Sequence, residues 1–136
     1  MKGGKIVRHL PGPYTSFRVG DTVFFHCLGF FYTRHARGFE VVEAPVGAVV
    51  RRLPAGHETI ELGRRTLFYH DGVFYERGRR PGEYVVVAAP AGAVVSTLPH
   101  DAVEERTGEQ TFHVARGVYY LAVTRGGERA YVVTRP

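Results

Sequence analysis

The sequence contains little of the chemistry that enzymes and disulfide-bonded proteins use. Its 136 residues include a single cysteine, Cys27, so no disulfide can form within the chain. Serine occurs only at Ser16 and Ser96, and neither lies between the glycines that flank the nucleophile of a hydrolase. Phosphate-binding glycine loops and the H-E-x-x-H zinc motif are also missing. We therefore interpret the protein as non-enzymatic and expect no cofactor.

Long apolar runs and helical patterns are absent as well. No apolar run approaches the roughly 20 residues that a membrane-spanning helix needs, so we expect no membrane span. The segment 1–5 lacks the apolar core of a secretion signal. Apolar residues do not recur at helical spacing over several turns, and the one helical turn that we expect lies within 100–109. The sequence therefore indicates an all-β protein.

Acidic residues are fewer than basic ones. The chain has 13 Asp and Glu against 18 Lys and Arg, which gives a formal net charge of +5 at pH 7. Arginines cluster in the middle of the sequence, namely Arg51, Arg52, Arg64, Arg65, Arg77, Arg79 and Arg80. One interpretation is a site for a polyanion such as nucleic acid, an acidic glycan or anionic lipid headgroups. The alternative is that these arginines only keep exposed turns soluble.

What the sequence does have is an aromatic hairpin. Asp71-Gly72 lies between the apolar runs 67–70 and 73–75, and Asp-Gly tolerates the positive φ angles of a tight hairpin turn. A two-residue turn would place Tyr69 opposite Phe74. Both faces of this hairpin are largely apolar, so we expect both to be covered.

This hairpin is part of a repeat. It recurs with turns expected at Leu28-Gly29, Asp71-Gly72 and Arg116-Gly117. A G-A-V-V-x-x-L-P motif occurs at 47–54 and 92–99, and 6–11 reads I-V-R-H-L-P. Self-similarity at a period of about 45 residues is typical of repeat architectures. The pattern predicts three units: 1–43, 44–88 and 89–136.

Histidines do not form a convincing metal or catalytic site. His26, Cys27 and His35 offer three possible zinc ligands, but the positions of His26 and Cys27 are occupied by Tyr69 and His70 in the second repeat and by Val114 and Ala115 in the third. Positions that accept apolar residues are typical of packing. The pairs His70-Asp71 and His100-Asp101 are adjacent in sequence, so their side chains point to opposite faces of a strand. We expect no metal site and no catalytic residue.

One aromatic position is occupied by tyrosine in every repeat, at Tyr32, Tyr75 and Tyr120. A tyrosine has an apolar body and a hydroxyl that needs a partner. We favour a packing role within each hairpin. The alternative is a repeated platform for stacking sugars or for contact between subunits.

These motifs resemble an uncharacterised bacterial family of small envelope proteins rich in tyrosine and valine. The resemblance rests on A-P-x-G-A-V-V-x-x-L-P, on an aromatic hairpin of the G-V-Y-Y type and on a G-Y-V-V-V-like strand, and it covers 44–95 best. It implies a cell-envelope or extracellular location and a domain of unknown function. It provides no catalytic residues.

Together, these observations predict an all-β fold of three tandem β-hairpin repeats of about 45 residues, as an array of small modules. A closed pseudo-threefold body of the β-trefoil type is the alternative. For function, we favour a non-enzymatic structural protein that self-assembles. The alternative is a binding module for an acidic glycan or other polyanion.

The expected mode of assembly concerns the first and last strands. We expect Ile6 and Val7 at one end, and Tyr131, Val132 and Val133 at the other, to lack a partner within the chain. Unpaired apolar strands favour pairing with another chain, and head-to-tail pairing produces a ring or a filament. The sequence therefore predicts a homo-oligomer or filament. The alternative is that the first and last segments pair within one chain and close a threefold monomer.

Overall fold

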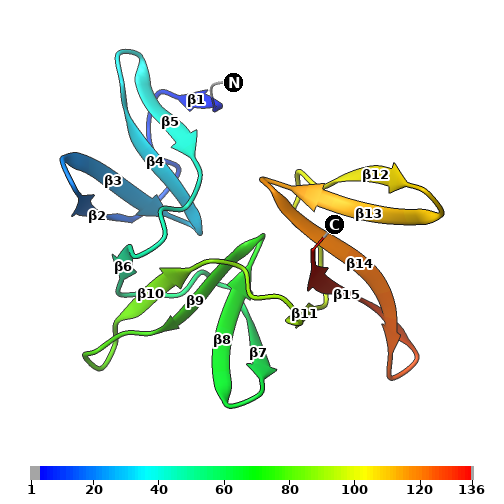
Figure 1. The fold of residues 1–136 in the computed structure, drawn as a ribbon. Helices are drawn as coiled ribbons and strands as arrows, with labels where there is room; N and C mark the ends of the chain where they lie inside the picture. The colour runs from blue at the N-terminus through cyan, green and yellow to red at the C-terminus, as the bar shows by residue number, and fades with distance from the viewer. Residues whose placement is uncertain (1–3, 136) are drawn as a thin grey trace. The chain divides into compact units, whose positions relative to one another are not determined.

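The computed structural model describes residues 4–135 and contains three separate five-stranded antiparallel sheets (Figure 1). The first sheet has the order β1-β5-β4-β3-β2. Its strands are β1 (Ile6–Val7), β2 (Tyr14–Val19), β3 (Thr22–Cys27), β4 (Phe30–His35) and β5 (Gly38–Val42). We call this sheet and its loops the first module.

The second and third modules repeat this arrangement, with the orders β6-β10-β9-β8-β7 and β11-β15-β14-β13-β12. The second comprises β6 (Val49–Val50), β7 (Glu58–Leu62), β8 (Arg65–His70), β9 (Val73–Arg77) and β10 (Tyr84–Val87). The third comprises β11 (Val94–Val95), β12 (Val103–Thr107), β13 (Gln110–Ala115), β14 (Val118–Arg125) and β15 (Glu128–Thr134). The predicted all-β fold of three tandem modules is confirmed.

Each module consists of a short strand followed by a four-stranded meander, and the last strand returns to pair with the short one. Ile6 pairs with Glu40 of β5, and Val132 of β15 pairs with Val94 of β11. The expectation that the first and last strands lack partners is therefore wrong. The physical reason is that the closing strand of a meander folds back beside the short strand of its own module.

The three hairpin turns lie at the predicted residues. Both turn residues have positive φ in each case: 46° and 90° at Asp71-Gly72, 52° and 88° at Leu28-Gly29, and 49° and 81° at Arg116-Gly117. Tyr69 pairs with Phe74, as a two-residue turn requires. The hairpin prediction is confirmed, although only one of the three turns carries the Asp-Gly signal.

The helical turn expected within 100–109 is wrong. Residues Val103–Thr107 form the edge strand β12, whose partners in β13 run from Val114 to Gln110. All five β12 residues are exposed, so the segment lacks the alternation of apolar and polar residues by which a strand is predicted from sequence. Pairing with β13 decides the conformation here. Among residues 4–135 all regular structure is β, and no helix long and apolar enough to cross a membrane is present.

Each sheet has two faces that are covered differently. In the first module, Phe25, Cys27 and Tyr32 lie on one face and pack against residues of the same module, namely Val7, Leu10, Phe30, Phe39 and Val41. We call this the inner face. The outer face of the same hairpin carries His26 and Phe31, because strand side chains alternate.

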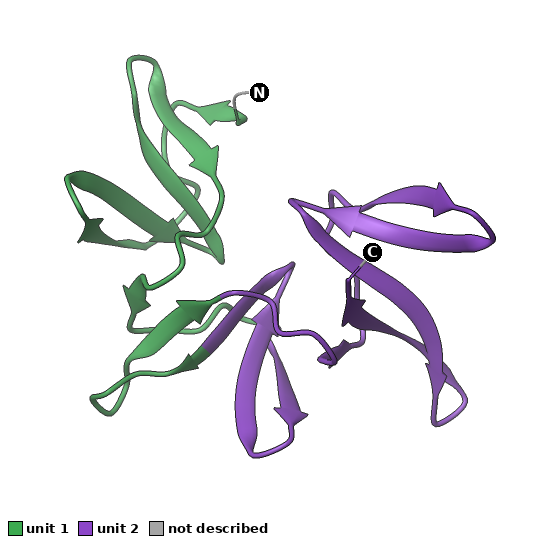
Figure 2. Ribbon diagram, in the orientation of Figure 1, with its two compact units in different colours: residues 1–55, 76–87 green, residues 56–75, 88–136 purple. Residues whose placement is uncertain are grey.

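The described chain divides into two compact units (Figure 2). One unit comprises residues 1–55 and 76–87, of which 4–55 and 76–87 are described, and it contains the first module with β6 and β10. The other comprises 56–75 and 88–136, described to residue 135, and contains the hairpin of the second module with the third module. The boundary passes through the second sheet, so each unit holds parts of two consecutive modules.

The turn glycines give a matched test of this packing. A Cβ added at Gly72 would lie 3.0 Å from Cγ of Pro99 and 2.8 Å from Nη2 of Arg116, whereas one added at Gly117 would have no described atom within 4 Å. A left-handed conformation costs a non-glycine residue about 1–2 kcal/mol. Both Gly72→Ala and Gly117→Ala should therefore lower the free energy of unfolding, with Gly72→Ala losing more. Equal losses in urea titrations would contradict the packing of the second turn on Pro99.

Candidate functional site

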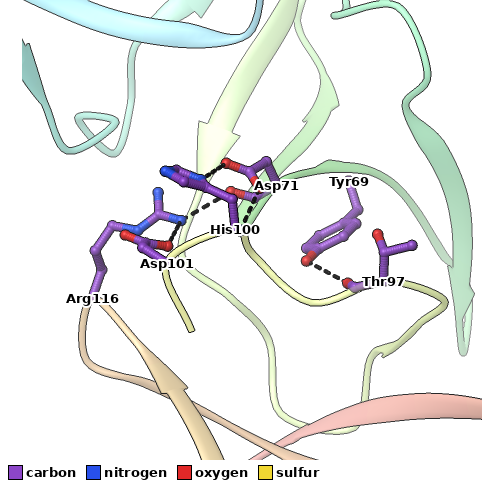
Figure 3. Close-up of polar contacts among 6 residues, drawn as sticks. All are labelled: Tyr69, Asp71, Thr97, His100, Asp101 and Arg116. Atoms are coloured by element: carbon purple, nitrogen blue, oxygen red, sulfur yellow. Dashed lines mark hydrogen bonds and ion pairs between the residues drawn. The ribbon is translucent and has the colours of Figure 1, made fainter. Parts of the chain in front are cut away.

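The main cluster of polar side chains lies where the second module meets the third, within one compact unit. It is built from the hairpin turn of the second module and from a segment that precedes β12. We name the three equivalent segments the first (8–13), second (51–56) and third (96–101) proline segments, because each contains the Leu-Pro pair of the repeat. Figure 3 shows residues of the third proline segment against the second hairpin.

Asp71 is the centre of this cluster (Figure 3). Its carboxylate accepts a hydrogen bond from the backbone N–H of His100 at 2.7 Å and lies 2.6 Å from His100 Nδ1. Arg116, in the turn of the third hairpin, donates to the Asp71 carbonyl at 3.1 Å and to Asp101 at 2.8 Å. The side chain of His100 is 64% exposed, so this ion pair is open to water. These contacts hold the turns of the second and third hairpins to the third proline segment.

Two buried tyrosines, Tyr69 and Tyr120, lie near these charged side chains. The Tyr69 hydroxyl donates to the carbonyl of Thr97 at 2.8 Å (Figure 3). Burial raises the pKa of Tyr69 far above its usual range, and burial also raises the pKa of Tyr120 to about 12. The Tyr120 hydroxyl makes no hydrogen bond of normal geometry among the described residues, yet it lies near enough to Tyr69 for each hydroxyl to affect the pKa of the other. Both tyrosines are neutral at physiological pH.

We call the contact between one module and the proline segment of the next a joint. A cavity of about 440 Å³ opens beside the joint of the second and third modules and is lined by Gly56, His57, Glu58, Tyr69, His70, Asp71, Ser96 and Thr97. Burial lowers the pKa of His70, with the nearby Asp71 opposing this change. The Ser96 hydroxyl donates to Glu58 at 2.7 Å, and the Ser96 backbone N–H donates to the same carboxylate at 2.9 Å. These bonds hold the third proline segment to β7. Ser96 therefore serves as a hydrogen-bond donor with a structural role.

Sequence reasoning missed the pairing of Asp71 with His100. It considered each histidine only with its sequence neighbour, and 29 residues separate the two partners. A signal was present in the repeat, because the corresponding residues of the first hairpin and second proline segment are Leu28 and Ala55. When two positions of the repeat both change from an apolar residue to a charged or titratable one in the same joint, the change indicates that they are in contact.

The joint between the first and second modules is mostly apolar and lies within the other compact unit. There, β2 lies against β6. A cavity of about 400 Å³ is lined by Pro13, Tyr14, Thr15, His26, Leu28, Gly29, Arg51, Arg52, Leu53, Pro54 and Ala55. His26 stacks on Phe31 with the ring centroids 4.6 Å apart. The outer face of the first sheet thus meets the second proline segment.

The zinc-ligand types considered in the first hairpin take part in packing. Cys27 is buried, and its Sγ lies 3.5 Å from the carbonyl of Gly12, while the ring of His26 stacks on Phe31. His35 Nδ1 accepts from the backbone N–H of Arg37. Within residues 4–135, no group of three His, Cys, Asp or Glu side chains is arranged to hold a metal ion.

The arginine clusters are exposed at all seven positions, which are Arg51, Arg52, Arg64, Arg65, Arg77, Arg79 and Arg80. Arg51 lies 3.8 Å from Glu83 and is thereby brought to the loop 77–84, which surrounds a small cavity of about 160 Å³. Arg51, Arg77, Arg79 and Arg80 therefore belong to one compact unit. Arg64 and Arg65 belong to the other.

The repeated tyrosines Tyr32, Tyr75 and Tyr120 are 5%, 0% and 0% exposed, so all three are buried, and Tyr120 lies near Tyr69 of the second module. Burial raises the pKa of all three. Among the proposed assembly strands, Ile6 and Val7 pair with β5, while the run Tyr131, Val132 and Val133 pairs with β14.

Comparison with known proteins gives one match. A family described as a family of unknown function (DUF6515) matches residues 2–135. No curated protein and no solved structure matches the chain.

The buried tyrosines predict a loss of stability at alkaline pH. An unfolded tyrosine ionises near pH 10, whereas Tyr69, Tyr75 and Tyr120 ionise at higher pH in the folded protein. The unfolded state therefore binds fewer protons above about pH 10, and the free energy of unfolding should fall as pH rises through this range. Urea titrations at increasing pH, with tyrosinate absorbance as a second readout, test this. Tyr120→Phe should flatten the fall, and the exposed control Tyr14→Phe should follow the wild-type curve. A flat wild-type profile from pH 8 to 11 would contradict the assignment.

Proposed function

The chain belongs to the family of unknown function DUF6515, and from the joints between its modules we propose that it is a non-enzymatic structural protein that associates with copies of itself. The resemblance of its motifs to small envelope proteins supports a location in the cell envelope or outside the cell. Polar side chains at the joint between the second and third modules make structural contacts, as Ser96 does with Glu58 and Asp71 does with His100.

The observation that carries this proposal is a contact used twice. In one unit β2 lies against β6, and in the other β7 lies against β11, which are the equivalent strands one module later. The outer face of the first sheet meets the second proline segment, and Tyr69 on the outer face of the second sheet bonds to Thr97 of the third. A surface that joins successive copies of a module within a chain is suited to join copies of the chain.

Self-assembly predicts a mass that depends on concentration. Sedimentation velocity and light scattering from low micromolar to high micromolar chain concentration should show species larger than 15.1 kDa that grow with concentration, and electron microscopy should show rings or filaments. A single 15.1 kDa species over that range would refute the proposal.

A second candidate function is polyanion binding, and the position of Arg51 favours it. The Arg51–Glu83 contact brings this arginine to the loop that carries Arg77, Arg79 and Arg80. Four arginines from two sequence regions then contribute to one basic surface. A surface of this kind attracts phosphate and sulfate groups through charge.

Removal of the loop arginines tests this candidate. The triple variant Arg77→Ser, Arg79→Ser and Arg80→Ser should elute from heparin at lower salt than a control of equal charge, Arg106→Ser, Arg125→Ser and Arg129→Ser. Ionic contacts weaken steeply with salt, so the difference in heparin binding between the two variants should shrink as the salt concentration of the binding buffer is raised. If both variants elute together, the arginines serve solubility and the candidate function fails.

A further inference from the structure

The outer face of each of the first two sheets is covered by the proline segment of the next module. On the first sheet, His26 and Phe31 are 7% and 2% exposed. On the second, Tyr69 and Phe74 are each 1% exposed, and their rings lie 4.9 Å apart. The prolines that take part, Pro54 and Pro99, are buried, although most other residues of their segments are exposed.

The outer face of the third sheet is different. Its equivalent residues are Val114 and Tyr119, which pair across β13 and β14 and are only half-buried. Val103, on the adjoining edge strand, is 63% exposed. The turn residue Gly117 is exposed, whereas the equivalent Gly29 is buried. Phe112 on the same face is buried, but the part of the face at Val103, Val114 and Tyr119 is more exposed than its equivalents in the first two sheets.

The first proline segment is the complementary half. Leu10 packs on the inner face of its own sheet, as the repeat requires. Pro11, however, is exposed where Pro54 and Pro99 are buried. The side of this segment that would meet the outer face of a preceding sheet is therefore open in the described chain.

Charge is also complementary between the two halves. Glu105 lies on the outer face of the third sheet, where its carboxylate accepts from the Tyr119 hydroxyl at 3.4 Å, and it is exposed. Its equivalent in the second sheet is Ile60, which is buried. The first proline segment begins with the exposed cation Arg8, at the position held by Arg51 in the second segment and by Ser96 in the third. Ser96 meets Glu58 in its joint, and Glu105 lies two residues beyond the equivalent of Glu58 on the same face of β12. An acidic residue thus lies within the reach of an arginine side chain placed as Ser96 is.

We propose that the outer face of the third sheet (Val103, Glu105, Val114 and Tyr119) binds the first proline segment of a second copy of the chain, with Arg8 facing Glu105. This inference rests on the proposed self-assembly and specifies its surfaces. The contact is heterologous, because a different surface is used on each copy, and it repeats the joint between modules. The end strands β1 and β15 keep their pairing within the sheets.

Charge reversal tests these surfaces. Glu105→Arg and Arg8→Glu are each expected to raise the dissociation constant for self-association about tenfold or more, because each places like charges together. A chain that carries both reversals restores opposite charges and should recover wild-type association. Glu128→Arg, an exposed reversal at the first residue of β15, should associate as the wild type does. Sedimentation velocity gives the constants, and circular dichroism checks that each variant is folded.

The outcomes separate the two proposals. Recovery in the double variant supports the assigned surfaces. Assembly that neither single reversal weakens would overturn these surfaces and leave self-assembly in place. A wild-type protein that is monomeric at every concentration would overturn both.

Discussion

Small sheets that are apolar on both faces must be covered twice, and the rest of this structure depends on that constraint. The inner face is covered from within the module, as Leu10 and Phe39 show in the first. The outer face needs a neighbour. Burying an aromatic or leucine side chain contributes about 1.5–3 kcal/mol, whereas a hydrogen bond contributes a net of about 0.5–1.5 kcal/mol. Apolar covering therefore supplies most of the stability of a joint, and its hydrogen bonds mainly determine which residues meet.

The two joints use the same backbone arrangement with different side chains. Leu28 and Ala55 line the first, whereas Asp71, His100 and Arg116 form the second. Exposed ion pairs contribute only about 0–1 kcal/mol, so the charges of the second joint add little stability. They do add direction, because Arg116 must reach both Asp71 and Asp101. Sequence divergence between modules thus gives each joint its own chemistry.

Several polar side chains of this protein lie at the joint between the second and third modules. The buried hydroxyls of Tyr69 and Tyr120 and the carboxylate of Asp71 lie where one module passes to the next. The contact between an outer face and a proline segment is used at both joints. The proposed assembly would use this contact once more.

The sequence by itself determined the local features of this protein. The Asp-Gly turn, the recurrence of its glycine and the alternation of aromatic residues specify three hairpins, because turn geometry and strand periodicity depend on neighbouring residues. The tertiary structure decided what lies far apart in sequence: the return of β5 to β1, the strand at Val103–Thr107 and the meeting of Asp71 with His100. None of these has a local signature, since an exposed edge strand lacks apolar alternation and a contact across 29 residues depends on how two modules pack. Only the packed fold distinguishes an outer face that is covered from one that is open.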